Sequence, residues 1–262
     1  MTNQENYILK LANEVFEEAF LANNYYQIII QIHENYKQFQ VQLDEYSGFF
    51  LYAYTALTYA AAMETAKLFD EDKKTISVYK LQNHFSEYIH SQNEMNLDML
   101  KQSEYNHTFS EKEIIFYRKN YPDISKLIED KQRNCNYIST KDIVRIQLSI
   151  TEYLKVMKYK RKMLQPIINN LHDHRNMVFA HSDERFEVST IDEKLPLMIK
   201  DLLPLIQYSL DISNFVITFF TGVTKSERIS NIDDIQRLLK NIKDFSYYEY
   251  LSQEFILKEQ PT

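Results

Sequence analysis

The chain has 262 residues, 44% of them hydrophobic, and a formal net charge of −7. Its two glycines are too few for Walker or Rossmann phosphate-binding loops, and its single cysteine excludes an intramolecular disulfide and a cysteine-based zinc site. This composition predicts a mostly helical protein of a reducing compartment, and we expect a cytoplasmic location.

The first part of the chain predicts three long helices. Apolar residues recur at helical spacing over residues 5–39 and again over residues 76–100. Between them, residues 43–69 are apolar nearly all round, which is typical of a central buried helix. The alanine triplet at residues 60–62 would let a neighbouring helix approach this segment closely.

The middle of the chain carries two signals for helix ends. Ser110 with Glu113 three residues later is the pattern of a capping box, which predicts a helix that begins here. Pro122 marks a boundary, because the residue before a proline avoids helical geometry. We interpret residues 122–139, which are polar, as a short helix and a loop.

A long helix is predicted from residue 141, capped by Ser139 or Thr140, to residue 163. Pro166 either kinks this helix or begins a new one, and the helical pattern continues to about residue 182. Residues 186–190 (FEVST) are the only segment that we interpret as a plausible strand, with a loop as an equal alternative.

The last part predicts a strongly apolar helix over residues 195–220 and an amphipathic helix over residues 232–245. We find no uncharged run near the roughly 20 residues of a membrane span, so no membrane segment is expected. The fold class is therefore an all-α bundle of about six to eight helices in a single domain. Residues 1–225 form the helical domain, and residues 226–262, a helix and a Tyr-rich tail, are expected to pack on it.

The stretch LHDHRNMVFAHSDERF, from Leu171 to Phe186, contains an arginine where an aliphatic residue is expected. At about 100° per residue, Arg175 falls inside the apolar stripe of its helix. An unpaired buried guanidinium is costly, so this face is expected to meet a carboxylate, a cleft or another subunit. Glu64, in the apolar helix, is a candidate partner for Arg175.

The histidines of this stretch predict neither a metal site nor a hydrolase triad. Metal ligands on one helix lie about four residues apart, and His172, His174 and His181 have no ligand at that spacing. The His-Ser-Asp run that starts at His181 is contiguous, so its side chains fan out and cannot align as base, nucleophile and orienting group. We therefore expect no metal and no cofactor.

Arginine and histidine together suit one chemistry without a metal, the cleavage of RNA through its own 2′-hydroxyl. Histidine transfers a proton near neutral pH, and a guanidinium stabilises charge on the phosphoryl oxygens. Arg175 and His181 would lie about 9 Å apart along an ideal helix and roughly 120° around it, so they would not touch. A twofold axis between two copies of the helix could bring them into a shared site.

The string RNMVFAHSD, which begins at Arg175, resembles the R-x4–6-H motif of the HEPN superfamily (higher eukaryote and prokaryote nucleotide-binding domains). Together with residues 63–81 it is similar to the abortive-infection AbiU-like branch, in which a helix ending in LFD, here residues 68–70, precedes the motif helix. This resemblance extends over residues 6–220. It implies a helical bundle, dimerisation through the motif helix and metal-independent endoribonuclease activity in toxin or phage-defence systems.

Carried onto this sequence, the resemblance implies that Arg175 stabilises the phosphorane, that His181 transfers a proton and that Asn176 positions the substrate or His181. It also implies a homodimer, RNA as a partner and a cognate antitoxin. The alternative is a non-catalytic HEPN-like scaffold that binds nucleotide, RNA or protein.

A basic run just before the motif is a candidate contact for the RNA backbone. The alternative is an ordinary solvated helix face. The residues of this run are Lys155, Lys158, Lys160, Arg161 and Lys162.

Overall fold

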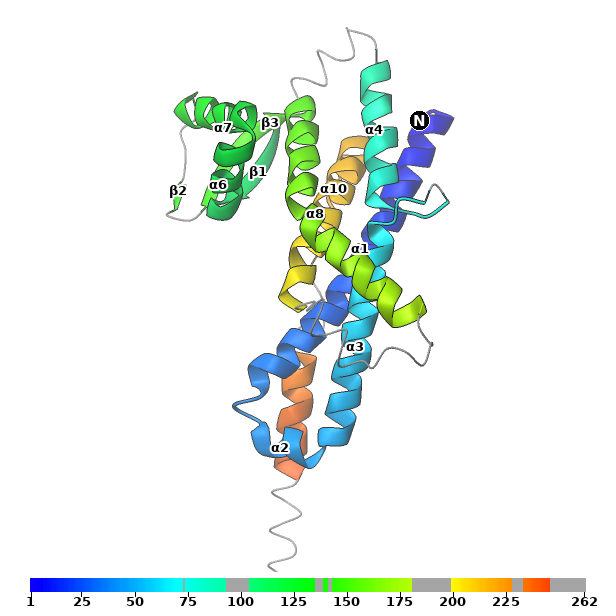
Figure 1. The fold of residues 1–262 in the computed structure, drawn as a ribbon, viewed down its shortest axis with the longest axis vertical. Coiled ribbons are helices and arrows are strands. Elements are labelled where there is room, and N and C mark those ends of the chain that lie inside the picture. The colour runs from blue at the N-terminus through cyan, green and yellow to red at the C-terminus, as the bar shows by residue number, and fades with distance from the viewer. Residues whose placement is uncertain are drawn as a thin grey trace, which may run out of the picture.

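The computed structural model describes residues 1–72, 74–92, 104–134, 139–140, 143–180, 199–227 and 233–245. These residues form a mostly helical single domain with one small sheet (Figure 1). The helices are α1 (Asn3–Asn35), α2 (Gln40–Glu45), α3 (Ser47–Leu68), α4 (Val78–Ser91), α6 (Glu111–Asn120), α7 (Pro122–Asn134), α8 (Ile150–Ala180) and α10 (Ile199–Thr221). The strands are β1 (Glu104–Ser110), β2 (Ser139–Thr140) and β3 (Ile143–Ser149), and a further helix spans residues 234–245.

The long helix α1 forms the axis of the bundle and packs along α10 and α3. Small buried side chains on both α1 and α3 let these two helices approach closely. They are Ala12, Ala19 and Ala22 on α1, and Ala61, Ala62 and Ala66 on α3. The close approach expected at the alanine triplet is therefore confirmed for two of its members.

The helix α10 lies in the core. By length and mean hydropathy (23 residues, 1.3) it could cross a membrane, but 67% of its apolar window is buried inside the protein, as in a core helix. It ends at Gly222, whose φ of 71° is a left-handed conformation that glycine adopts without strain. The expected apolar helix and its end are confirmed.

The helix expected from residue 141 is wrong for residues 143–149, which form β3. Buried and exposed side chains alternate strictly along this strand, which is a period of two and not the 3.6 of a helix. The buried residues are Val144, Ile146 and Leu148, and the exposed ones are Arg145 and Gln147. The strand expected at residues 186–190 lies outside the described residues.

The central strand β3 pairs antiparallel with β1 on one side and with β2 on the other. In β1, His107 is buried opposite Ile146. Because this buried position is polar, the apolar–polar alternation typical of a strand is not evident in the sequence of β1. Ser149 at the end of β3 then caps α8. Its side chain accepts from the backbone N–H of Glu152, whose carboxylate accepts from the backbone N–H of Ser149.

The helix α8 continues through Pro166, which lies near the middle of its 31 residues. Figure 1 shows α8 changing direction about halfway along its length. A proline removes one helical hydrogen bond and its ring clashes with the preceding turn, which accounts for the bend. Of the two possibilities at this proline, the kink is the one found.

The expectation that residues 43–69 form a central buried helix holds only for their second half. In the first half of α3, Phe49, Leu51 and Tyr52 are 66%, 64% and 76% exposed. This part lies beside α2 and the helix of residues 234–245 at the lower end of the molecule (Figure 1). A second, small apolar cluster joins these helices through Phe39, Leu43, Phe50 and Leu239.

A buried ionic cluster joins α6, α8 and α10. Lys160 of α8 forms ion pairs with Glu113 of α6 at 3.2 Å and with Asp211 of α10 at 3.5 Å. Glu113 also completes the predicted capping box with Ser110, which is confirmed. Burial opposes ionisation of Glu113, but the Lys160 ammonium and the bonds from Ser110 outweigh it, so the pKa of Glu113 is lowered.

His107 is buried beside this cluster. Its Nε2 has no hydrogen-bond partner within the part of the chain that the structure describes. Burial, and after it the positive charge of Lys160, lowers the pKa of His107 to about 4. The imidazole is therefore neutral in the folded protein at neutral pH.

This histidine predicts a loss of stability in mild acid. In the unfolded chain its pKa is about 6.5, so protons favour unfolding as the pH falls from there towards 4. Above about pH 6.5 the imidazole is neutral in both the folded and the unfolded chain, so it leaves stability unaffected. Below that pH the unfolded chain takes up the proton first, and we expect the free energy of unfolding to fall by up to about 3 kcal/mol. In urea unfolding between pH 7 and 4.5, His107→Gln should remove this part of the pH dependence. His84→Gln, on the surface of α4, should keep it, and equal behaviour of the two variants would contradict the account.

Candidate functional site

Arg175 lies on the second half of α8, where this helix crosses α3 (Figure 1). Leu164, Ile168 and Leu171 are buried along the same face, as the helical spacing predicts. Arg175 continues this face towards the end of the helix, with 25% of its side chain exposed. The arginine is thus held between the core and the solvent.

The guanidinium meets a carboxylate, as expected, but that carboxylate is Asp70. The Nη1 of Arg175 donates to Oδ2 of Asp70 at 3.2 Å, and Asp70 follows closely on the end of α3. The expected partner Glu64 is instead paired with Lys67 at 2.8 Å, one turn along its own helix. Asp70 is the last residue of the LFD string, so this string supplies the counter-ion of the motif arginine.

Asp70 is held in its ionised form. The backbone N–H of Asp72 donates to its Oδ1 at 3.1 Å, and this bond is the main cause that lowers the pKa of Asp70. Burial acts in the opposite direction, and the bond from Arg175 lowers the pKa further. The ion pair is therefore intact at neutral pH.

His172 lies one turn before Arg175 and belongs to the same cluster. Burial, and then the charge of Arg175, lowers its pKa, against the effect of Asp70, Glu71 and a hydrogen bond with the backbone of Ala66. Its Nε2 is buried and has no hydrogen-bond partner among the residues described. No metal ligand lies four residues from His172, so the metal-site pattern does not single it out in the sequence. Its i, i+3 spacing from Arg175 is the signal that places it beside the arginine.

The other motif residues are only partly described. Asn176 is exposed beside Arg175. His181 lies outside the described residues, so its predicted meeting with Arg175 stays a prediction. Within the described ranges, no group of three His, Cys, Asp or Glu side chains could hold a metal ion.

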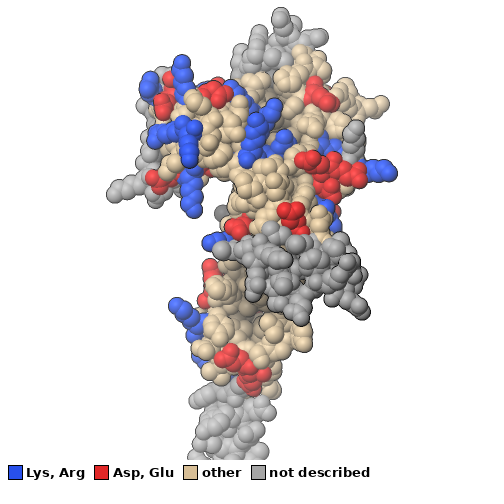
Figure 2. Space-filling model, viewed as in Figure 1, with Lys and Arg blue, Asp and Glu red and all other residues tan. Residues whose placement is uncertain are grey.

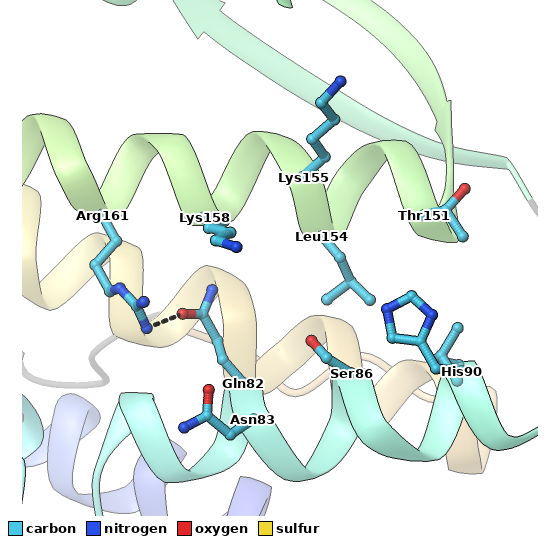
Figure 3. Close-up of a pocket in the computed structure, with 10 residues that line it drawn as sticks. Gln82, Asn83, Ser86, His90, Thr151, Leu154, Lys155, Lys158 and Arg161 are labelled. Carbon is cyan, nitrogen blue, oxygen red and sulfur yellow. Dashed lines mark hydrogen bonds between the residues drawn. The ribbon is translucent and has the colours of Figure 1, made fainter.

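The basic run does not form one surface. Lys160 is buried in the ionic cluster with 12% of its side chain exposed, which corrects the expectation that it contacts RNA. Lys155 pairs with Asp123 at 2.7 Å, and Lys162 lies 5.2 Å from the centre of the Tyr159 ring. Lys158 and Arg161, and also Lys155, line a pocket between α4 and α8 (Figure 3). Residues two apart on a helix point about 200° apart, which separates Lys160 from Lys158.

Basic side chains do gather on one side of the molecule, despite the net charge of −7. Figure 2 shows Lys and Arg in the upper left of the view, over α6, α7 and the first half of α8. The last turns of α6 and α7 contribute Arg118, Lys119, Lys131 and Arg133. Three of these lie beside carboxylates, Arg118 at Glu129, Lys131 at Glu152 and Arg133 at Asp130. The attraction of this side for polyanions therefore rests mainly on the excess of Lys and Arg in the first half of α8.

The mostly helical fold and the arginine–asparagine pair near the end of its long, bent helix agree with the HEPN class that the sequence resembles. The AbiU2 family model matches residues 6–245, which include the motif and the helix of residues 234–245. The chain belongs to the HEPN AbiU2 family, a family of abortive-infection domains of phage defence. The resemblance found in the sequence is confirmed. Neither the curated proteins nor the solved structures contain a match to the chain.

The Arg175–Asp70 pair predicts a small, acid-sensitive contribution to stability. Because both side chains are about a quarter exposed, Asp70→Asn should lower the free energy of unfolding at pH 7 by about 1 kcal/mol or less. The folded-state pKa of Asp70 lies below its unfolded value, so this contribution is complete above about pH 5 and is lost as the pH falls through the folded pKa.

Urea unfolding at pH 7 and near pH 3 measures this difference. Asp173→Asn, which changes an exposed aspartate of the same helix α8, is the matched control and should leave stability unchanged. A loss for Asp70→Asn that is equally large at both pH values would contradict the role of the ionised carboxylate.

Proposed function

We propose that this chain is a metal-independent endoribonuclease of an abortive-infection system, with RNA as its substrate. The observation that carries the proposal is the placement of Arg175, an arginine on a helix face otherwise turned to the core. Membership of the AbiU2 family, whose match includes this motif, supports it. The basic side over α6, α7 and α8 supplies attraction for RNA.

In the proposed reaction, the 2′-oxygen of a ribose attacks the adjacent phosphorus and the 5′-oxygen of the next nucleotide leaves. One group removes the proton of the 2′-hydroxyl, and a second protonates the leaving oxygen. His181 is the proposed proton-transfer residue, and Arg175 stabilises the charge on the phosphoryl oxygens. An arginine has five N–H donors, so the bond to Asp70 does not exhaust them. That bond instead fixes the orientation of the guanidinium.

The proposed site is shared between two copies of the chain. On an ideal helix, Arg175 and His181 would lie about 9 Å apart along the axis, too far for both to touch one phosphate from the same face. A twofold axis through the motif helices would place the arginine of one copy beside the histidine of the other. We also propose that a cognate antitoxin restrains the enzyme in the cytoplasm, where its RNA substrate lies.

Cleavage of RNA in EDTA tests the proposal. The wild type should cleave, whereas Arg175→Ala should be slower by on the order of 100-fold, the usual cost of one donor to a developing oxyanion. His181→Ala should lose on the order of 100-fold or more. Arg237→Ala and His33→Ala are matched controls on exposed positions and should cleave normally. Equal rates for all five proteins would contradict the proposal.

Mixing the two inactive variants tests whether the site is shared. Random exchange of subunits makes half of the dimers mixed, and each mixed dimer would hold one site with both residues intact, so roughly a quarter of the wild-type rate should return. If both variants are inactive alone and the mixture stays inactive, the site is not shared in this way.

The second candidate function is a non-catalytic scaffold. The observation that favours it is the Arg175–Asp70 ion pair, which already gives the guanidinium a partner within one chain. In that case the wild type would not cleave RNA in EDTA. Arg175→Ala and Asp70→Ala would then lower the free energy of unfolding by similar amounts, and neither would change a cleavage rate.

A further inference from the structure

A pocket of about 360 Å³ lies between α4 and the first half of α8, on a different part of α8 from Arg175 (Figure 3). One wall is formed by Gln82, Ser86 and His90 of α4, and the other by Leu154, Lys158 and Arg161 of α8. No aspartate or glutamate is among the described residues that line it. The pocket therefore combines positive charge with neutral hydrogen-bonding groups.

Arg161 is held in place at one end of the pocket. It donates to Oε1 of Gln82 at 2.6 Å, and its guanidinium lies 4.5 Å from the centre of the Tyr79 ring. Both contacts orient the planar group without neutralising its charge. The five donors of a guanidinium exceed what one bond to Gln82 uses.

Lys158 lies one turn before Arg161 and faces the same pocket (Figure 3). Within the described ranges, neither of these two cations has a carboxylate within 4.0 Å. Lys155 also lines the pocket, but its charge is paired with Asp123 at 2.7 Å. Two neighbouring cations without counter-ions, in a pocket without acidic groups, favour an anion as the ligand.

We propose that this pocket binds one nucleotide of an RNA strand, with its phosphate between Lys158 and Arg161. The volume lies in the range of sites for small ligands. Ser86 and His90 offer hydrogen bonds, and Leu154 offers an apolar surface for the ribose or base. The assignment to RNA rests on the proposed function. A free mononucleotide and inorganic phosphate are the other sources of the same group.

The basic surface around the pocket favours a strand over a free nucleotide. Lys and Arg side chains continue from the first half of α8 over α6 and α7 (Figure 2). A strand anchored by one nucleotide could follow these charges with its other phosphates. The pocket would then hold RNA at a fixed place while the chemistry takes place at Arg175.

Binding of an uncleavable RNA tests the proposal. The probe is a fluorescent single strand of about ten nucleotides with 2′-O-methyl riboses, titrated into the full chain in EDTA. Lys158→Gln should weaken binding about fivefold and reduce the slope of log affinity against log salt by about one. Lys162→Gln, a neighbouring lysine outside the pocket lining whose ammonium lies against the Tyr159 ring, is the matched control and should change affinity less than twofold.

Equal effects of the two lysine variants, or no effect of either, would overturn the proposal. AMP and inorganic phosphate, used as competitors, distinguish the sources. Tighter binding of AMP than of RNA, lost in Lys158→Gln, would overturn the assignment to a strand. Because the probe cannot be cleaved, the result is independent of catalysis. If Lys158-dependent binding persists while the wild type fails to cleave ordinary RNA, the proposed function fails and this site stands.

Discussion

The buried ammonium of Lys160 fixes the rotation of α8, and the candidate sites depend on that rotation. A buried charge must be matched where it lies, and its partners Glu113 and Asp211 come from two different elements, α6 and α10. Turning α8 would leave one of these charges unpaired inside the protein. With Lys160 facing α6 and α10, the side chains of Lys158 and Arg161 face α4, and the pocket forms there.

Beyond its bend, the same helix brings a second charge to a second carboxylate. Arg175 donates a hydrogen bond to Asp70, and Asp70 in turn accepts one from the backbone N–H of Asp72, just after α3. The two ion pairs differ in purpose. The one at Lys160 is enclosed and holds α6 and α10 against α8, whereas the one at Arg175 keeps a guanidinium oriented at the surface. An oriented, partly exposed arginine can bind the phosphate of a ligand, and an enclosed lysine cannot.

The helices could largely be predicted from the sequence, because their periodicity and end signals are local. The capping box before α6 and the glycine at the end of α10 are both found where expected. The partners of buried charges could not be predicted. Whether Glu64 or Asp70 meets Arg175 depends on where α8 crosses α3, and whether Lys160 or Lys158 is buried depends on the rotation of α8. In β3 the alternation was visible, but capping residues just before it suggested a helix instead.

The ends of the RNA products test the central claim most directly. Cleavage through the 2′-hydroxyl leaves a 2′,3′-cyclic phosphate on one fragment and a 5′-hydroxyl on the other, because the attacking oxygen belongs to the substrate. Mass spectrometry of fragments made by the wild type in EDTA should show these two ends, and a substrate with 2′-deoxyribose at the scissile position should resist cleavage there. Fragments with a 3′-hydroxyl and a 5′-phosphate, or cleavage at the deoxyribose, would contradict the account.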